Sequence, residues 1–137
     1  MDTTEQTRQL VDELYATLKT GDRAKLAALF TEDVEWYPPE AAPIGPIKGA
    51  AQVAAELAGD TPKKLFDMKT FRLQVHKVTV DGDTAIVQQA LSAKTRDGAQ
   101  YDNEYCWVYT YRDGKVARIV EYADTLKAAR IFGWAES

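Results

Sequence analysis

The chain has 137 residues, a formal net charge of -4 and one cysteine. Its length predicts a single domain, residues 1–137, and the 45% of hydrophobic residues are enough for a core. Acidic and basic residues are interleaved without a basic stripe, which argues against a nucleic-acid partner. The single cysteine excludes an internal disulfide, and no apolar stretch is long enough to span a membrane. The polar N-terminus lacks a signal-peptide region, so we expect a cytoplasmic protein.

The first sixty residues have the spacing of helices. Residues 4–19 carry an apolar stripe at Leu10, Val11, Leu14, Tyr15 and Leu18. We expect Thr3 and Gln6 to form the capping box of this helix and Gly21 to end it. A second short helix begins after Asp22, and residues 34–37 predict a short strand ended by two prolines. After a Pro/Gly-rich loop, a third helix starts at residue 50 and is expected to end at Gly59.

From residue 65 onward the apolar period changes to two. Four strands are predicted, at 65–80, 84–95, 101–111 and 115–123, and each turn between them contains Asp-Gly. Strands joined by hairpins form an antiparallel meander, after which Asp124 can cap a last helix. Helices first and a meander afterwards predict an α+β domain with helices packed on one sheet face. We expect a long twisted sheet of this kind to form a cone around a cavity.

The strand at 101–111 has one strongly aromatic face. Its odd positions are Tyr101, Asn103, Tyr105, Trp107, Tyr109 and Tyr111, and Cys106 lies on the other face. Tyrosine and tryptophan carry polar groups that need partners when buried, whereas a core built for stability alone more often uses leucine, isoleucine and valine. The pattern favours the wall of a partly hydrated small-molecule pocket, although aromatic strands also form dimer interfaces.

The last strand contains an unexpected carboxylate. Ala117, Ile119, Glu121 and Ala123 share one face by alternation, so Glu121 lies among residues that look buried. Burial disfavours the charged form of a carboxyl group and raises its pKa, which suits Glu121 to general acid/base work. The competing interpretation is that Glu121 lies in water at a cavity mouth or pairs with an arginine, for which Arg72, Arg118 and Arg130 are candidates.

The chain resembles the SnoaL-like branch of the nuclear transport factor 2-like superfamily. The segments that carry the resemblance are "LYATLKTGDRAKLAALFTEDVEW", "IKGAAQV" and "YRDGKVARIVEYADT". It implies a cone-shaped, cystatin-like fold, with N-terminal helices packed on a curved antiparallel sheet that encloses a pocket. It also implies a homodimer built on the outer sheet face. The superfamily includes ketosteroid isomerase, limonene epoxide hydrolase and polyketide cyclases, as well as proteins without catalysis.

The known chemistry of two of these relatives does not carry over. Alignment with ketosteroid isomerase puts Pro38 at the position of its aspartate base and Leu14 at its oxyanion-hole tyrosine, with Tyr15 one place off. Of five functional positions in limonene epoxide hydrolase, only the second aspartate keeps its chemistry here, as Glu121. The fold is therefore indicated more specifically than the reaction.

The resemblance and the strand alternation together predict a site. Glu121 is the expected catalytic residue, and the expected substrate-binding residues are Tyr15, Trp36, Gln88, Ser92, Asn103, Tyr105 and Trp107. The amides and tyrosines would bond a substrate carbonyl and stabilise developing negative charge. We expect no cofactor and no metal, because His76 is the single histidine and no phosphate-binding loop or dinucleotide fingerprint occurs.

Three functions remain open from the sequence. The first is a cofactor-independent isomerase, cyclase or hydrolase-type enzyme acting on an apolar carbonyl or polycyclic compound through Glu121. The second is a binding module that holds a small hydrophobic molecule without turnover. The third is a dimeric interaction protein whose interior is filled by its own side chains.

Overall fold

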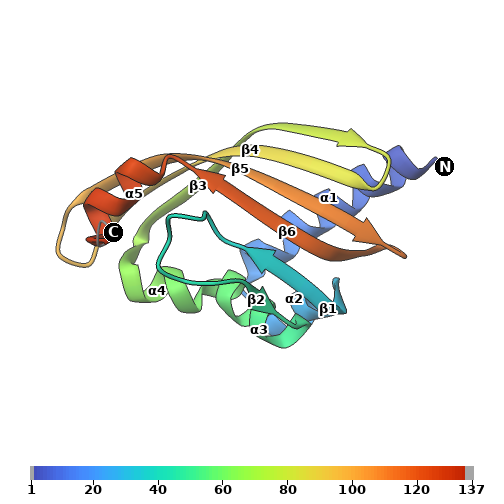
Figure 1. The fold of residues 1–137 in the computed structure, drawn as a ribbon, viewed down its shortest axis with the longest axis horizontal. Coiled ribbons are helices and arrows are strands. Elements are labelled where there is room, and N and C mark those ends of the chain that lie inside the picture. The colour runs from blue at the N-terminus through green and yellow to red at the C-terminus, as the bar shows by residue number, and fades with distance from the viewer. Residues whose placement is uncertain (1, 135–137) are drawn as a thin grey trace.

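The computed structural model describes residues 2–134. It contains one sheet of six strands in the order β2-β1-β6-β5-β4-β3. The strands are β1 (Phe30–Tyr37), β2 (Ile47–Lys48), β3 (Phe66–Asp81), β4 (Thr84–Thr95), β5 (Gln100–Arg112) and β6 (Lys115–Ala123). The helices are α1 (Thr3–Thr20), α2 (Arg23–Ala27), α3 (Ala50–Ala55), α4 (Thr61–Leu65) and α5 (Thr125–Phe132). Figure 1 shows α5 at the end of the molecule opposite the N-terminus.

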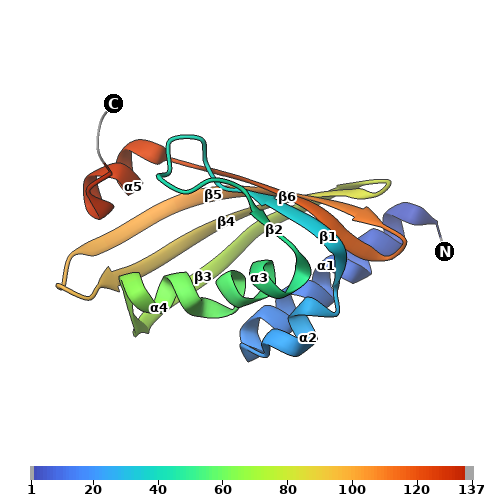
Figure 2. The same ribbon diagram turned by 60° about the horizontal axis from the view of Figure 1, so that its bottom comes forward.

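The α+β architecture expected from the sequence is confirmed, with one refinement to the sheet. Strands β3 to β6 form the antiparallel meander, and β1 then adds to β6 in parallel. The sheet is therefore mixed, because the chain returns from β1 through β2 and the helices before the meander begins. Figure 2 shows the curved sheet with α1, α2, α3 and α4 on one side of it, which we call the concave face.

Two helix boundaries differ from the expected ones. The N-cap of α1 is Asp2, whose carboxylate accepts from the Glu5 backbone N–H at 2.8 Å, because Thr3 is already helical. Gly59 does not end the third helix: it bends the chain at a φ of 122° within the wide turn Glu56–Asp60. Thr61 then begins α4, with Pro62 in its first turn, where proline is well tolerated. Gly21 ends α1, as expected, at a φ of 68°.

The concave face carries two apolar clusters. The larger, here the aliphatic cluster, is mainly Val and Leu side chains from α1, α2, α3 and the sheet, with Leu14, Leu26, Val34, Val53 and Ile119 almost fully buried. The smaller, here the aromatic cluster, packs Phe66 and Tyr101 against Phe132 of α5, with Ala93 and Ala128 beneath. Within residues 2–134, no helix has the length and apolar character needed to cross a bilayer.

Candidate functional site

The aromatic face of β5 points to the concave side, as the alternation predicted. Tyr101 and Tyr109 are buried, and Tyr105 and Trp107 between them are half-buried. Trp107 lies between the rings of Tyr105 and Tyr109, each at a centroid distance of 6.3 Å. Tyr105 packs against the aromatic cluster and Trp107 against the aliphatic cluster. The middle of β5 therefore lies where the two clusters meet.

Glu121 lies at this junction. Its position in β6 is directly opposite Trp107 in β5. The indole N–H of Trp36 donates to Glu121 Oε1 at 3.1 Å, and the Trp36 and Trp107 rings are 5.7 Å apart between centroids. Among the described residues Glu121 forms no ion pair, and Arg118 instead stacks on Tyr37 at 4.7 Å from the ring centroid. The arginine-paired interpretation of Glu121 is therefore wrong.

The surroundings of Glu121 change its acidity. Burial raises the pKa of Glu121 to about 7, because the charged form loses hydration, while the Trp36 hydrogen bond lowers it. The second carboxylate oxygen, Oε2, has no hydrogen-bond partner among residues 2–134, and the side chain is half-buried. A carboxyl group with one oxygen fixed and the other open near neutral pH can accept or donate a proton.

A second polar group comes from α1 and β4. The Tyr15 hydroxyl donates to Gln89 Oε1 at 2.9 Å and lies 2.8 Å from the Tyr109 hydroxyl. Tyr15 has one proton, which goes to Gln89, so Tyr109 must donate to Tyr15. Burial raises the pKa of Tyr15 and of Tyr109, which keeps both hydroxyls protonated. The predicted residue Tyr15 thus lies on the concave side and orients the amide of Gln89.

Two predicted pocket residues are on the wrong face. Gln88 pairs with Cys106 and Ser92 pairs with Asp102, and residues directly opposite in an antiparallel pair share a face. Both therefore lie on the outer face, where Gln88 is exposed and Ser92 accepts a hydrogen bond from Gln100. The sequence alternation of β4 is weak because both faces mix polar and apolar residues. The buried glutamine is Gln89, the residue after Gln88, and the prediction missed it.

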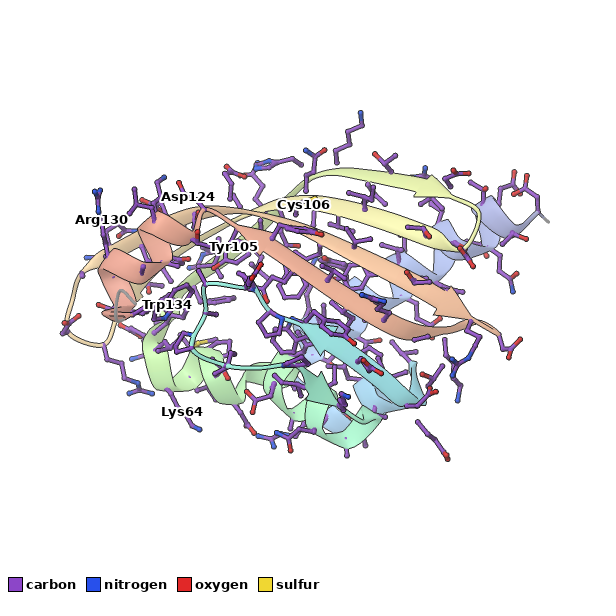
Figure 3. The ribbon with its side chains drawn as sticks, viewed as in Figure 1. Lys64, Tyr105, Cys106, Asp124, Arg130 and Trp134 are labelled. Carbon is purple, nitrogen blue, oxygen red and sulfur yellow. The ribbon has the colours of Figure 1, made fainter. Side chains whose placement is uncertain are left out.

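Asn103 is on the predicted face, but its side-chain N–H groups already bond other groups of the protein. Its Nδ2 donates to the Tyr101 hydroxyl at 2.7 Å and to the Asp124 carbonyl at 2.9 Å. Tyr101 in turn bonds the Tyr105 hydroxyl at 2.7 Å. Asn103 therefore ties β5 to the start of α5, and both of its N–H groups are used. Tyr105, the last member of this series of hydrogen bonds, stacks with Trp107 and is labelled in Figure 3.

Two hollows of the surface are not lined by Glu121. One of about 450 Å³ is lined by His76, Gln88, Glu104, Cys106 and Tyr122, together with Tyr105 and Ala123. Another, of about 380 Å³, lies beside α1 and is lined by Gln6, Gln9, Leu10 and Glu13. In the described part of the chain, no three His, Cys, Asp or Glu side chains gather as they would around a metal ion.

Known structures share this fold over nearly the whole chain. A protein provisionally described as a SnoaL-like polyketide cyclase from Jannaschia sp. CCS1 has a TM-score of 0.80 at 18% identity, covering 99% of this chain and 97% of that one. TerC, co-crystallised with polyporic acid, has a TM-score of 0.77 at 22% identity, covering 93% of this chain and 98% of that one. A protein provisionally described as a ketosteroid isomerase from Kribbella flavida DSM 17836 has a TM-score of 0.70 at 26% identity, covering 90% of this chain and 81% of that one.

The family is shown by sequence as well as by fold. No curated protein matches the sequence. The model of the SnoaL-like domain matches residues 11–119, which includes Trp36, Gln89 and the aromatic strand β5 but stops just short of Glu121. The family match therefore does not extend to Glu121, the acidic residue of the candidate site. The family match nevertheless shows that the chain belongs to the SnoaL-like domain family.

Proposed function

We propose that the protein is a cofactor-independent enzyme acting on a small apolar carbonyl or polycyclic compound, with Glu121 as the general acid/base. The observation that carries the proposal is the state of Glu121: one oxygen is held by Trp36, the other is open, and the pKa is about 7. At neutral pH both forms of the carboxyl group are populated, so it can take a proton and return it. Isomerisation, cyclisation and addition of water all require such a transfer.

The neighbouring aromatic groups fit an apolar substrate. The rings of Trp36, Tyr105 and Trp107 give the junction of the two clusters an aromatic surface that suits a ring system. Burial raises the pKa of Tyr105, so its hydroxyl stays protonated and can donate to an oxygen on which negative charge develops. A compound larger than water would enter by displacing the loop at 38–46, which directly follows β1 and carries the exposed Ile44. The relative TerC, which was crystallised with polyporic acid, supports a small organic ligand for this fold.

Proton exchange on a simple ketone tests this function. The protein is incubated with 2-tetralone in D2O, and loss of the protons beside the carbonyl is followed by NMR. The rate should rise with a midpoint near pH 7, because the ionised carboxylate is the base, and should be lost in Glu121→Gln. Glu104→Gln is the matched control, since Glu104 lies on the outer face of β5 and bonds His76. Exchange that is indifferent to Glu121→Gln, or a Glu121 carboxyl that titrates near 4.5 like a free one, would refute the assignment.

A homodimer through the outer face is a separate proposal. Ile86 and Tyr122 are exposed there, and large apolar side chains left bare on a sheet favour association with a second copy. We expect a dimer by light scattering at micromolar concentration and its dissociation in Tyr122→Lys. A monomeric wild type would contradict this proposal without affecting the assignment of Glu121.

A further inference from the structure

The amide nitrogen of Gln89 is an unused donor inside the molecule. The residue is 5% exposed, so its side chain is almost wholly buried. Its Oε1 accepts from Tyr15, while its Nε2 has no hydrogen-bond partner among residues 2–134. The two N–H groups of Gln89 are therefore available to an acceptor that is not among residues 2–134.

The orientation of the Gln89 amide is given by its bond with Tyr15. The Tyr15 hydroxyl donates to Gln89 Oε1 at 2.9 Å and lies 2.8 Å from the Tyr109 hydroxyl. With Oε1 bonded to Tyr15, the two N–H groups of Gln89 lie on the side of the amide away from that hydroxyl. In this orientation the amide is ready to donate a hydrogen bond to a ligand.

Gln89 and Glu121 lie on either side of the aromatic strand. Gln89 in β4 is directly opposite Tyr105, and Glu121 in β6 is directly opposite Trp107. The backbones of β4 and β6 are two strand spacings apart, about 10 Å. The rings of Tyr105 and Trp107 lie between them, stacked at 22° to one another. A flat molecule lying across β5 would meet a donor at one end and the acid/base group at the other.

We propose that Gln89 is the residue that selects the ligand: its amide N–H binds a hydrogen-bond-acceptor oxygen on a flat ring compound, at the end of that compound remote from the atom that Glu121 protonates or deprotonates. The inference rests on the proposed function for the role of Glu121, and it adds the position and polarity of a second contact. A buried donor discriminates strongly, because a ligand without the oxygen leaves the N–H unpaired. An apolar wall at this position would bind rings with and without the oxygen alike.

A matched pair of ring compounds tests the role of Gln89. Fluorenone and fluorene have the same three-ring skeleton and differ by one carbonyl oxygen. Binding of each is followed by quenching of tryptophan fluorescence, since Trp36 and Trp107 lie beside the site. The wild type should bind fluorenone about tenfold more tightly than fluorene, the factor expected for one buried hydrogen bond. In Gln89→Met the preference should fall to about one, through weaker binding of fluorenone alone.

Two further variants separate the possible results. Gln88→Met alters the exposed glutamine that precedes Gln89, and this variant should keep the tenfold preference for fluorenone. Tyr15→Phe should reduce it, because the amide loses the bond that orients it. A preference that survives Gln89→Met, or a wild type that binds neither compound or both alike, would overturn the inference. The proposed function is read separately, from the NMR titration of the Glu121 carboxyl in Gln89→Met: a pKa still near 7 would leave it standing.

Discussion

The same residue types have different exposure and different hydrogen-bond partners on the two faces of the sheet. Tyr122 on the outer face is 59% exposed, whereas Tyr109 on the concave face is 3% exposed and bonded to Tyr15. Glu104 on the outer face bonds His76 in solvent, and Glu121 on the concave face bonds a buried indole. Glu121 and Tyr122 are adjacent in sequence, so the side of the strand, not the residue type, decides what each can do. Four substitutions can break or sharpen this contrast.

The largest effect is expected in the aliphatic cluster. Leu14 of α1 is 1% exposed, and Leu14→Ala leaves a cavity that the packed helix and sheet cannot close. We expect a loss of about 3 kcal/mol in the free energy of unfolding, measured by urea denaturation. A loss below 1 kcal/mol would mean that the concave face is loosely packed, and the contrast between the two faces would then fail.

The next effect depends on pH. The pKa of Glu121 is raised from 4.5 to about 7 in the folded chain, so the folded state holds the proton more tightly than the unfolded state. The stability that this contributes is present below pH 4.5 and is lost as the pH rises through about 7. Allowing for the solvent that reaches this half-buried side chain, ionisation at pH 8 costs about 2 kcal/mol.

Glu121→Gln removes that cost and keeps an acceptor for Trp36. Urea denaturation should find the variant more stable than the wild type at pH 8 by about 2 kcal/mol, and nearly equal to it at pH 5. The same substitution at Glu104 should produce no such pH-dependent gain. If wild type and Glu121→Gln instead unfold in parallel at both pH values, Glu121 is not buried as described.

A smaller effect is expected at Trp36. The indole N–H stabilises the ionised form of Glu121, so Trp36→Phe should raise the pKa of Glu121 further, by about one unit. Carbon-13 NMR titration of the side-chain carboxyl measures this shift directly. A lower pKa in the variant would contradict this expectation, because it would mean that water enters in place of the indole and hydrates the ionised carboxylate.

The smallest effect is expected on the outer face. Arg118 lies over the ring of Tyr37, and Arg118→Ala should cost only about 0.5 kcal/mol because the pair is open to solvent. The pKa of Glu121 should not change, since Arg118 does not contact it. A shift of that pKa in Arg118→Ala would show that the two faces are electrically coupled, against the separation described here.

The sequence alone determined the order of elements and the face of β5. Asp-Gly turns, the change of period after residue 64 and the run of alternating aromatics are local signals, and they predicted the meander, the aromatic wall and the inward side of Glu121. The start of α4 at Thr61 also had a local signal, Pro62 in the first turn, that the prediction did not use. The parallel pairing of β1 with β6 had none, because it joins strands about eighty residues apart.

Tertiary structure decided which glutamine faces inward and what Glu121 touches. Both faces of β4 mix polar and apolar residues, so alternation along this strand does not say which glutamine is buried. The register of β4 against β5, set through the turn after Thr95, pairs Ala93 with Tyr101. This register places Gln89 inside and Gln88 outside. The bond from Trp36 joins residues 85 positions apart. Side-chain alternation follows from the geometry of one strand and can be read along it. A partner for a buried charge depends on which distant strand packs beside it, and that is settled only when the chain folds.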